Sequence, residues 1–488
     1  MIDKNDLWET ATKLRGNIAS SDYKDIVLGL LFLKYADMEF NKIYNELLKT
    51  TPEFKDDVDE YTSHKVFYLP QEARFDFLLS SPTGEINKKL DDALNLIMRD
   101  NPTLKNVLNP CFIRLDADGI KIIDVMKVIA NILEDKEVLS NSDYLGEVYM
   151  YFLGMFARSE GSKGGEYFTP ECIVELMVRL VEPFEGKLYD PACGSGGMFI
   201  HAIDLIKKNK KDEDKLEIYG QELNTTTWRL AKLNMAVHRL NANLGDKGTD
   251  TFLDDIHKTL KADYILANPP FNLKDWGRDH VLEDIRWKYG VPPKNNANYA
   301  WISHMMHHLS DTGTMAMILA NGSLSTSTSE ELAIRKSLID ANKVEAIISL
   351  PEKLFLTTGI PVCIWILKNH KVSDDILFID ASSLGIMETR ALRVLEENDI
   401  QSITNLYHNF RDNKEVIDTK GFAKQVKVQD VIDNNYVLTP GRFVGIEEEI
   451  DDGIPFEVKV KELNDELLSL FEKNKELEEK IKEGMENE

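Results

Sequence analysis

The second half of the chain alternates short β-prone runs with helical stretches, and this alternation limits its fold more than any other feature. The β-prone runs are residues 188–189, 217–219, 264–267, 315–319, 344–348 and 363–367. Such alternation favours an α/β fold, in which helices cover both faces of a mostly parallel sheet. Ligands of these folds bind at the carboxyl ends of the strands. We therefore expect the functional residues directly after the predicted strands.

Residues 1–150 have a helical pattern instead. Apolar side chains cover every face of residues 26–33, which is typical of a helix buried on all sides. Two further apolar stripes at helical spacing are Leu90, Leu94 and Met98, and Ile122, Val125, Ile129 and Leu133. A glycine-rich segment, residues 159–165, follows as a hinge. We expect a helical domain over residues 1–150 and an α/β domain over residues 151–445.

Residues 446–488 contain a heptad pattern of apolar side chains with charged flanks. Its a and d positions are Val460, Leu463, Leu467, Leu470, Asn474, Leu477 and Ile481. A polar Asn at one such position fixes the register of a coiled coil at some cost in stability. The segment is either a solvated helix lying on its own domain or a coiled-coil-type helix that docks on another chain. We favour docking.

The net charge limits how the chain could bind nucleic acid. Lys and Arg number 58 and Asp and Glu number 83, which gives −25. A protein that neutralises many phosphates alone is usually basic. A nucleic-acid substrate would thus require a local basic lining or a partner. No apolar run approaches the roughly 20 residues that span a bilayer, and the N-terminus lacks the pattern of a signal peptide. We expect a cytoplasmic protein without membrane contact.

No metal site is expected from the sequence. The four cysteines are far apart and lack paired spacing. His304, His307 and His308 share one helical face, but no acidic or cysteine partner at a suitable spacing is evident.

Residues 190–197, Asp-Pro-Ala-Cys-Gly-Ser-Gly-Gly, follow a predicted strand and open a helix. Glycines at such a turn let a ligand approach the backbone closely. The spacing matches neither G-x-G-x-x-G nor a P-loop. The carboxylate of Asp190 suits the methionyl ammonium of S-adenosylmethionine and would repel a pyrophosphate. A purely structural turn is the alternative.

Two further segments fit such a cofactor. Glu222 ends the next predicted strand, where a carboxylate can accept both ribose hydroxyls, although strand-end glutamates are also common without a role. Upstream, residues 166–171 include Thr169-Pro170-Glu171, which has the pattern of a helix N-cap followed by proline and an acidic first turn. These residues either only begin a helix or also hold the polar end of the cofactor.

Asn268-Pro269-Pro270-Phe271 comes directly after the predicted strand 264–267. The amine of adenine is a poor nucleophile because its lone pair is delocalised into the ring. An Asn oxygen and a backbone carbonyl can accept its two N–H groups and direct the lone pair at a methyl group. The prolines would stiffen the loop, and Phe271 could stack on a base that has left the duplex. An ordinary turn after a strand is the alternative.

These motifs, in this order, resemble the amino-methyltransferases of DNA. The N-terminal segments 7–8, 14–16, 23–24 and 27–35, together with 164–170 and 296–301, are similar to the modification subunits of type I restriction systems. The resemblance implies a helical N-terminal domain, a Rossmann-like methyltransferase domain dependent on S-adenosylmethionine, and methylation of the N6 amine of a flipped adenine in double-stranded DNA.

The resemblance also assigns residues to roles. The residues that would hold the cofactor are Glu166, Tyr167, Phe168, Thr169, Pro170, Glu171, Ser195, Gly196, Gly197 and Glu222, with support from Asp190 and Gly194. Asp250 would reach the adenine of the cofactor, although Asp254 and Asp255 compete nearby. The residues that would hold the target adenine are Asn268, Pro269, Pro270 and Phe271.

In such systems two modification subunits flank a specificity subunit that reads the DNA, and a restriction subunit can join them. A partner of this kind would account for the acidic charge, and the C-terminal heptad suits docking on it. Three other functions stay open at this point: a protein glutamine methyltransferase, an RNA base methyltransferase and a catalytically idle assembly module.

Overall fold

The computed structural model describes most of the chain between residues 20 and 445. The described residues are 8–9, 12, 20–133, 144–159, 169–355, 359–414, 416, 418–445, 460–461, 464, 467–472 and 474. The chain divides into two compact units, Met1–Val444 and Gly445–Glu488, and each is described by itself.

The N-terminal part of the first unit is helical, as the sequence predicts. Its helices are α2 (Ser20–Thr50), α3 (Val58–Ser63), α4 (Phe75–Leu79), α5 (Ile86–Asp100), α6 (Gly119–Leu133) and α8 (Tyr144–Ser159). Ile26, Leu30 and Leu33 of α2 are fully buried because other helices cover this long helix on several sides. The expected stripes also face the core, with Leu90 and Leu94 of α5 and Ile122 of α6 buried.

Among the described residues, nine strands form one sheet in the order β11-β8-β6-β7-β5-β4-β1-β2-β3. The strands are β1 (Gly186–Asp190), β2 (Leu216–Gly220), β3 (Ala242–Asn243), β4 (Ala262–Ala267), β5 (Leu309–Ala320), β6 (Val344–Ser349), β7 (Val362–Lys368), β8 (Asp375–Asp380) and β11 (Ala423–Lys427). The strands from β3 to β5 pair in parallel. In contrast, β7 is antiparallel to both of its neighbours, and β11 is antiparallel to β8.

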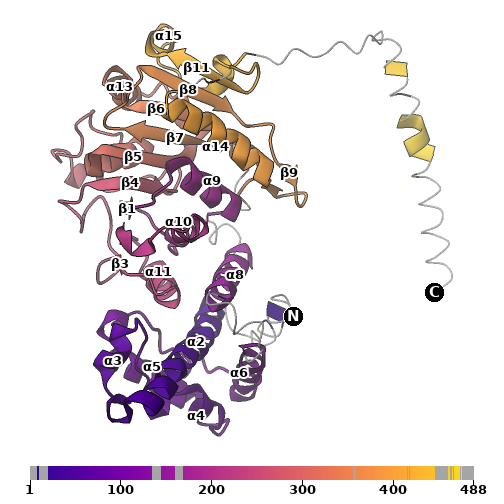
Figure 1. Ribbon diagram of the computed structural model, residues 1–488. Coiled ribbons are helices and arrows are strands. Elements are labelled where there is room, and N and C mark those ends of the chain that lie inside the picture. The colour runs from indigo at the N-terminus through magenta and orange to yellow at the C-terminus, as the bar shows by residue number, and fades with distance from the viewer. Residues whose placement is uncertain are drawn as a thin grey trace. The chain divides into compact units, whose positions relative to one another are not determined.

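Helices cover both faces of this sheet (Figure 1). The helices of this domain are α9 (Glu171–Val181), α10 (Gly197–Lys208), α11 (Thr225–Val237), α12 (Asn298–His308), α13 (Ser329–Asp340), α14 (Glu397–Arg411) and α15 (Val428–Asp433). Alternate strand residues enter two separate cores. Leu266 packs in the core that includes α9, α10 and α14, whereas Ile265 packs in the core that includes α12 and α13. Burial on both faces explains why the central strand β7 is an almost continuous apolar run.

Short elements connect this framework. The strands β9 (Ile386–Met387) and β10 (Arg393–Val394) form a separate antiparallel pair. The 3-10 turns are Pro52–Phe54, Gln71–Ala73, Pro102–Leu104, Glu213–Lys215, Arg278–His280, Asn321–Leu324 and Pro440–Arg442. Among the residues that the structure describes, ion pairs join the helical part to the α/β part: Arg239 contacts the buried carboxylate of Glu39, and Lys65 contacts Asp214.

The second unit is described only in part. Val460, Leu467 and Leu470 of the expected heptad lie in helical backbone and are exposed. Leu463, Leu477 and Ile481 lie outside the described residues, so the coiled coil stays a prediction. Of the helices that the structure describes, none is long and apolar enough to cross a bilayer.

A substitution at Gly313 would probe the close contact between β4 and β5, near the point where their pairing changes register. A Cβ at this buried position would lie 2.8 Å from the carbonyl oxygen of Ala262 and 2.8 Å from Leu309 Cδ1. Since a strand carbonyl cannot move aside cheaply, we expect Gly313→Ala to lower the free energy of unfolding by about 1–3 kcal/mol. Urea unfolding measures this change.

The matched control is Gly322→Ala. A Cβ on this exposed residue would meet no atom within 4 Å, so its effect should stay within about 0.5 kcal/mol. Equal effects of the two substitutions would contradict this account of the β4–β5 contact.

Candidate functional site

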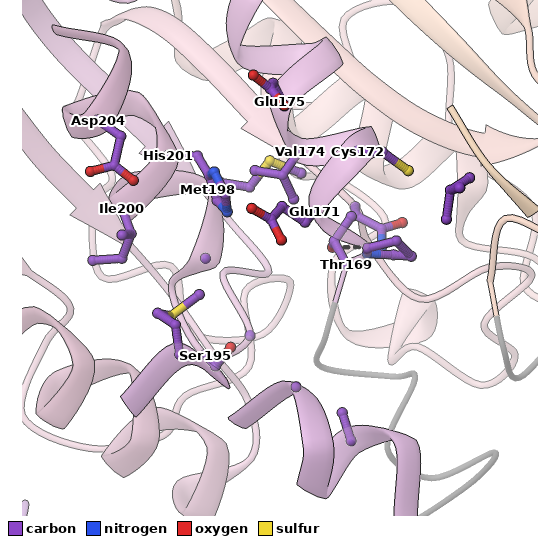
Figure 2. A pocket seen from close by; sticks show the side chains of 18 of the residues that line it. Thr169, Glu171, Cys172, Val174, Glu175, Ser195, Met198, Ile200, His201 and Asp204 are labelled. Carbon is purple, nitrogen blue, oxygen red and sulfur yellow. Dashed lines mark hydrogen bonds between the residues drawn. The ribbon is translucent and has the colours of Figure 1, made fainter. Parts of the chain in front are cut away.

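A large cavity lies at the carboxyl ends of β1 and β4 (Figure 2). Its volume is about 980 Å³, at the upper end of the range usual for small-molecule sites. The described residues of the sequence-predicted site that line it are Thr169, Pro170, Glu171, Asp190, Gly194, Ser195, Gly197 and Asn268. Three motifs that are separate in the sequence, residues 169–171, 190–197 and Asn268, therefore meet at one cavity.

The glycine turn after β1 adopts a backbone conformation that requires glycine. Gly194 and Gly196 have φ values of 54° and 81°, in the left-handed region that side chains disfavour. A Cβ on Gly196 would also come within 2.8 Å of Met235 Cε. The carbonyl of Ser195 accepts a hydrogen bond from the buried Asn234 side chain at 2.9 Å. This contact ties the turn to α11.

Asp190 supplies a buried carboxyl group beside this turn. It is 2% exposed, lines the cavity and accepts a hydrogen bond from the backbone N–H of Ala192 at 2.9 Å. Burial, with a smaller contribution from the charge of Glu222, raises the pKa of Asp190 to about 8. A positively charged ligand group beside this carboxyl would favour its ionised form.

Glu222 follows β2 and holds the glycine turn from the other side. Its carboxylate accepts from the backbone N–H of Gly194 at 3.1 Å and from that of Asn224 at 2.8 Å. Burial raises the pKa of Glu222 despite these bonds. Glu222, Gly196 and Asp250 are not among the described residues that line the cavity, but Glu222 contacts its glycine wall directly.

Asp250 lies in a turn beside Glu222. The backbone N–H of Thr249 donates to the carbonyl of Glu222 at 2.8 Å, which brings the two segments together. One carboxylate oxygen of Asp250 accepts from the backbone N–H groups of Phe252 and Leu253 at 2.8 and 3.1 Å. The side chain is therefore fixed by its own turn, at the edge of the sheet where the sequence places it.

Asn268 is held by a residue from the start of α9. Its Nδ2 donates to Thr169 Oγ1 at 2.9 Å, whereas its Oδ1 is shielded from water and has no hydrogen-bond partner among the described residues. An unpaired buried acceptor is costly, so a donor that enters the cavity would gain from reaching it. In the same loop, Phe271 packs edge-on against Phe355 with ring centroids 5.8 Å apart.

The remaining residues of the predicted site are two prolines of the Asn268 loop and the three residues 166–168. Pro269 is buried and Pro270 is exposed. Glu166, Tyr167 and Phe168 lie outside the described residues, so their roles stay predictions.

Sequence reasoning missed two walls of the cavity. One wall is formed by α8, which contributes Met150, Tyr151, Met155 and Arg158. The other comes from residues 388–400, near the β9–β10 pair. Neither wall contains a motif, because each contributes through position in the fold rather than through a recognisable spacing.

A third omission is His201 on α10, at the opening of the helix that the glycine turn begins. It lies among Glu171, Glu175 and Asp204 (Figure 2). Burial lowers the pKa of His201, and the three carboxylates oppose that shift. The spacing from His201 to Asp204 was visible in the sequence, but nothing marked those residues as cavity lining.

Comparisons with known proteins agree with this geometry. The N-6 DNA methylase family model matches residues 140–452, and the HsdM N-terminal domain model matches residues 4–129. The type I restriction enzyme HindI methylase subunit of Haemophilus influenzae is 40% identical over 412 residues, which cover 82% of this chain and 92% of that protein. The MjaIX methylase subunit of Methanocaldococcus jannaschii is 34% identical over 511 residues, covering 98% and 90%.

A solved structure supports the fold. The methyltransferase subunit of a type I restriction-modification system from Streptococcus thermophilus has a TM-score of 0.76 at 24% sequence identity, covering 90% of this chain and 98% of that one. The family model spans more than half of the chain, and the two methylase subunits match over most of their length. The chain therefore belongs to the N-6 DNA methylases and is the modification subunit of a type I restriction-modification system, an adenine-specific DNA methyltransferase.

Proposed function

We propose that the cavity between the glycine turn and Asn268 is where the chain transfers a methyl group from S-adenosylmethionine to the N6 amine of a flipped adenine. The observation that supports this best is the side chain of Asn268. Its amide nitrogen donates a hydrogen bond to Thr169, and its oxygen has no partner among the described residues. Asn268 lines the same cavity as Asp190. Methylation of an exocyclic amine needs such an acceptor.

The residues present fit S-adenosylmethionine. The buried carboxyl of Asp190 suits the ammonium of the methionyl part, and the backbone of residues 194–197 allows close approach. Glu222 and Asp250 provide carboxylates for the ribose and the adenine of the cofactor. Residues 166–171 would close on its polar end. When bound, the cofactor supplies an electrophilic methyl group on a sulfonium centre.

The protein residues act on the adenine amine. Asn268 Oδ1 and a backbone carbonyl of the same loop accept its two N–H groups, which draws the lone pair out of conjugation with the ring. In this structure the amide donates to Thr169 Oγ1, which leaves Oδ1 without a partner among the described residues. Phe271 stacks on the flipped base, and the edge-on contact with Phe355 fixes its ring.

Because the net charge of this chain is −25, a partner subunit would have to supply part of the positive surface that binds double-stranded DNA. We propose that two copies of this chain flank one specificity subunit, which reads the DNA sequence, and that a restriction subunit joins the full complex. The related proteins are named as subunits of type I restriction enzymes, which supports assembly with other subunits. The exposed apolar residues of the C-terminal helix are the proposed contact with the specificity subunit. We place the complex in the cytoplasm, where its DNA substrate lies.

Removing the Asn268 acceptor should abolish methylation while leaving cofactor binding intact. We expect Asn268→Ala to lower kcat by roughly 100-fold or more, the loss typical of a missing acceptor or donor at a reacting centre. Thr169→Val should lower it by about tenfold, since it frees the amide without removing it. The assay follows labelled methyl groups from S-adenosylmethionine into DNA with the specificity subunit present.

The matched control is the exposed Asn295, for which Asn295→Ala should retain full activity. Label in protein or RNA instead of adenine would overturn the proposed substrate. Full activity of Asn268→Ala would overturn the proposed role of that residue.

Cofactor binding should depend on pH through Asp190. Its raised pKa means that the carboxyl is mostly protonated below pH 8, so binding a cationic ammonium must release that proton. Affinity should therefore rise with pH between 6 and 7.5, by up to about tenfold per pH unit. Calorimetry in two buffers with different ionisation enthalpies measures both the affinity and the released proton.

The Asp190→Asn variant is the control for that dependence. It cannot release a proton, so it should bind more weakly and with a nearly flat pH profile over the same range. An equally steep profile in this variant would assign the titration to another group.

The C-terminal helix should be required for assembly. Deleting residues 455–488 should abolish co-purification with the specificity subunit while cofactor binding persists. In the full chain, the pair Leu467→Glu and Leu470→Glu alters two heptad positions and should have the same effect. Leu468→Glu alters an equally exposed residue outside the a and d positions and should retain the complex. Intact assembly after the deletion would refute the docking role.

A further inference from the structure

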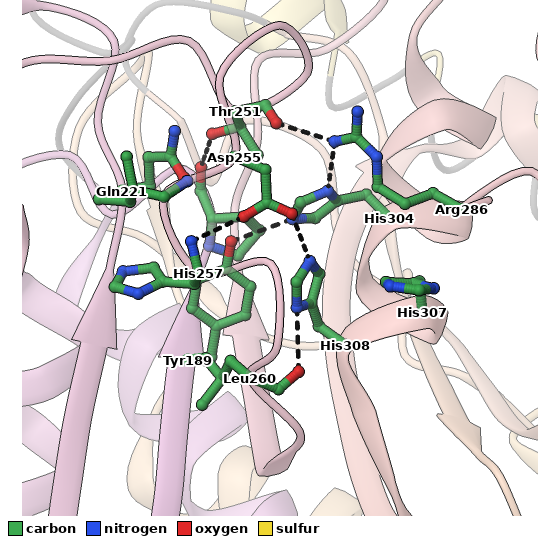
Figure 3. Close-up of polar contacts among 12 residues, drawn as sticks. Tyr189, Gln221, Thr251, Asp255, His257, Leu260, Arg286, His304, His307 and His308 are labelled. Atoms are coloured by element: carbon green, nitrogen blue, oxygen red, sulfur yellow. Dashed lines mark hydrogen bonds and ion pairs between the residues drawn. The ribbon is translucent and has the colours of Figure 1, made fainter. Parts of the chain in front are cut away.

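A buried polar network lies beneath the loop of residues 249–257, the loop that contains Asp250 (Figure 3). Asp255, His257, Arg286, His304 and His308 form it, and each is at most 8% exposed. The proposed chemistry uses none of these side chains. Burying several ionisable groups is costly unless each finds a partner, so the arrangement of partners is informative.

His308 lies between two acceptors. Its Nε2 is 2.9 Å from Asp255 Oδ2, and its Nδ1 is 3.1 Å from the carbonyl oxygen of Leu260. Both ring nitrogens of His308 therefore face hydrogen-bond acceptors, one of which is the Asp255 carboxylate. Burial alone would raise the pKa of Asp255, but the bonds from His308 and from the backbone of His257 bring it below its ordinary value.

His304, one turn earlier on α12, has the opposite role. Its Nδ1 is 3.1 Å from the Arg286 guanidinium, which can only donate, so this nitrogen accepts. Its Nε2 then donates to the hydroxyl of Tyr189 at 3.0 Å. Burial and the neighbouring His308 and Arg286 charges hold the pKa of His304 well below its ordinary value, which agrees with a neutral ring.

Arg286 joins this network to the backbone around Asp250. Its guanidinium donates to the carbonyls of Thr251 and Phe252 at 2.9 and 2.6 Å, and Asp284 balances its charge. The Phe252 and Leu253 amides bond the Asp250 carboxylate. The guanidinium and Asp250 therefore hold the same turn from opposite sides of its peptide groups.

Other side chains fix the rest of the loop. Gln221 Nε2 donates to the carbonyls of Thr249 and Asp254 at 3.3 and 2.8 Å. The hydroxyl of Thr251 donates to the carbonyl of Pro191, within the glycine motif, at 2.6 Å. Residues 249–255 are thus held by side chains from the end of β2, from α12 and from the segment before α12.

The same three side chains, Asp255, His304 and His308, could also be metal ligands. Their ligand atoms all lie within 4.8 Å of one another. However, each of these residues already forms hydrogen bonds to protein groups, and the Arg286 guanidinium lies against His304. A divalent cation would have to displace those bonds and accept a like charge as its neighbour. A hydrogen-bonded network accounts for the geometry better.

We propose that Asp255, Arg286 and His308 are positioning residues that fix the turn of residues 250–253, so that Asp250 is preorganised for the adenine of the cofactor. This inference rests on the proposed function of Asp250. Preorganisation matters because a flexible carboxylate loses conformational freedom on binding, whereas a fixed one has already lost it. Loosening the network should therefore weaken cofactor binding and leave the chemistry of Asn268 unchanged.

The test compares His308→Asn with His307→Asn in the full chain assembled with its specificity subunit. His307 is a half-buried neighbour on α12. Figure 3 draws no hydrogen bond or ion pair between His307 and the network. We expect His308→Asn to raise the Kd for S-adenosylmethionine by at least about tenfold, as small displacements of a binding group do. The kcat at saturating cofactor and the KM for DNA should stay within about twofold. His307→Asn should match the unaltered chain.

A folded His308→Asn variant with unchanged Kd would overturn the proposal, as would one equivalent of zinc bound to the purified chain. If His308→Asn does not fold, Arg286→Lys keeps the charge but loses the guanidinium fork, and it should give the same rise in Kd with faster hydrogen exchange at Phe252 and Leu253. If Arg286→Lys changes neither the Kd for S-adenosylmethionine nor the hydrogen exchange at Phe252 and Leu253, the proposal is also overturned.

Asp250→Ala separates this inference from the proposed function. If Asp250→Ala leaves the Kd unchanged, the assigned role of Asp250 is wrong. If Asp250→Ala raises the Kd and His308→Asn does not, the role of Asp250 stands and the positioning network is wrong.

Discussion

The hydrogen bond from Asn268 to Thr169 is the contact on which the proposed chemistry depends. A free side-chain amide can turn by half a rotation and exchange its acceptor for a donor, and a donor facing the adenine amine would repel it. Thr169 takes the NH₂ group at 2.9 Å and leaves the oxygen unpaired. The two residues are 99 positions apart. The sheet must therefore place the start of α9 beside the end of β4 before Asn268 has this hydrogen-bond partner.

Electrostatics divides the cavity into regions with different preferences. Asp190 is buried and Glu222 is half-buried, and loss of hydration raises the pKa of each carboxyl group. A positive ligand group beside the glycine turn would therefore favour the ionised form of these carboxyl groups and be stabilised by it. The Asn268 wall contains a neutral acceptor instead. A positively charged group would pair with Asp190, and an uncharged amine would donate to Asn268. The proposed methyl donor has the first group, and adenine has the second.

Much of this site could be predicted from the sequence because each motif is local. The glycines at 194 and 196 and the Asn-Pro-Pro-Phe loop each follow a strand, and strand ends in parallel sheets meet at one edge. The reversed direction of β7 could not be predicted, because a buried apolar run has the same pattern in either direction. The partnership of Asp255 with His308 was also invisible, since 53 residues separate them and no spacing rule applies across the sheet.

Aromatic packing joins the two halves of the site into one body. Phe252, beside the Asp250 turn, packs against Trp276 and Trp301 with ring centroids 4.9 and 4.3 Å apart. Trp276 lies in the loop that begins at Asn268, and Trp301 lies on α12. All three rings are at most 5% exposed. Close-packed rings resist relative movement, so the segment proposed for the cofactor and the loop proposed for the target base cannot shift independently. The separation between methyl donor and acceptor is thus set by the core rather than by either loop alone.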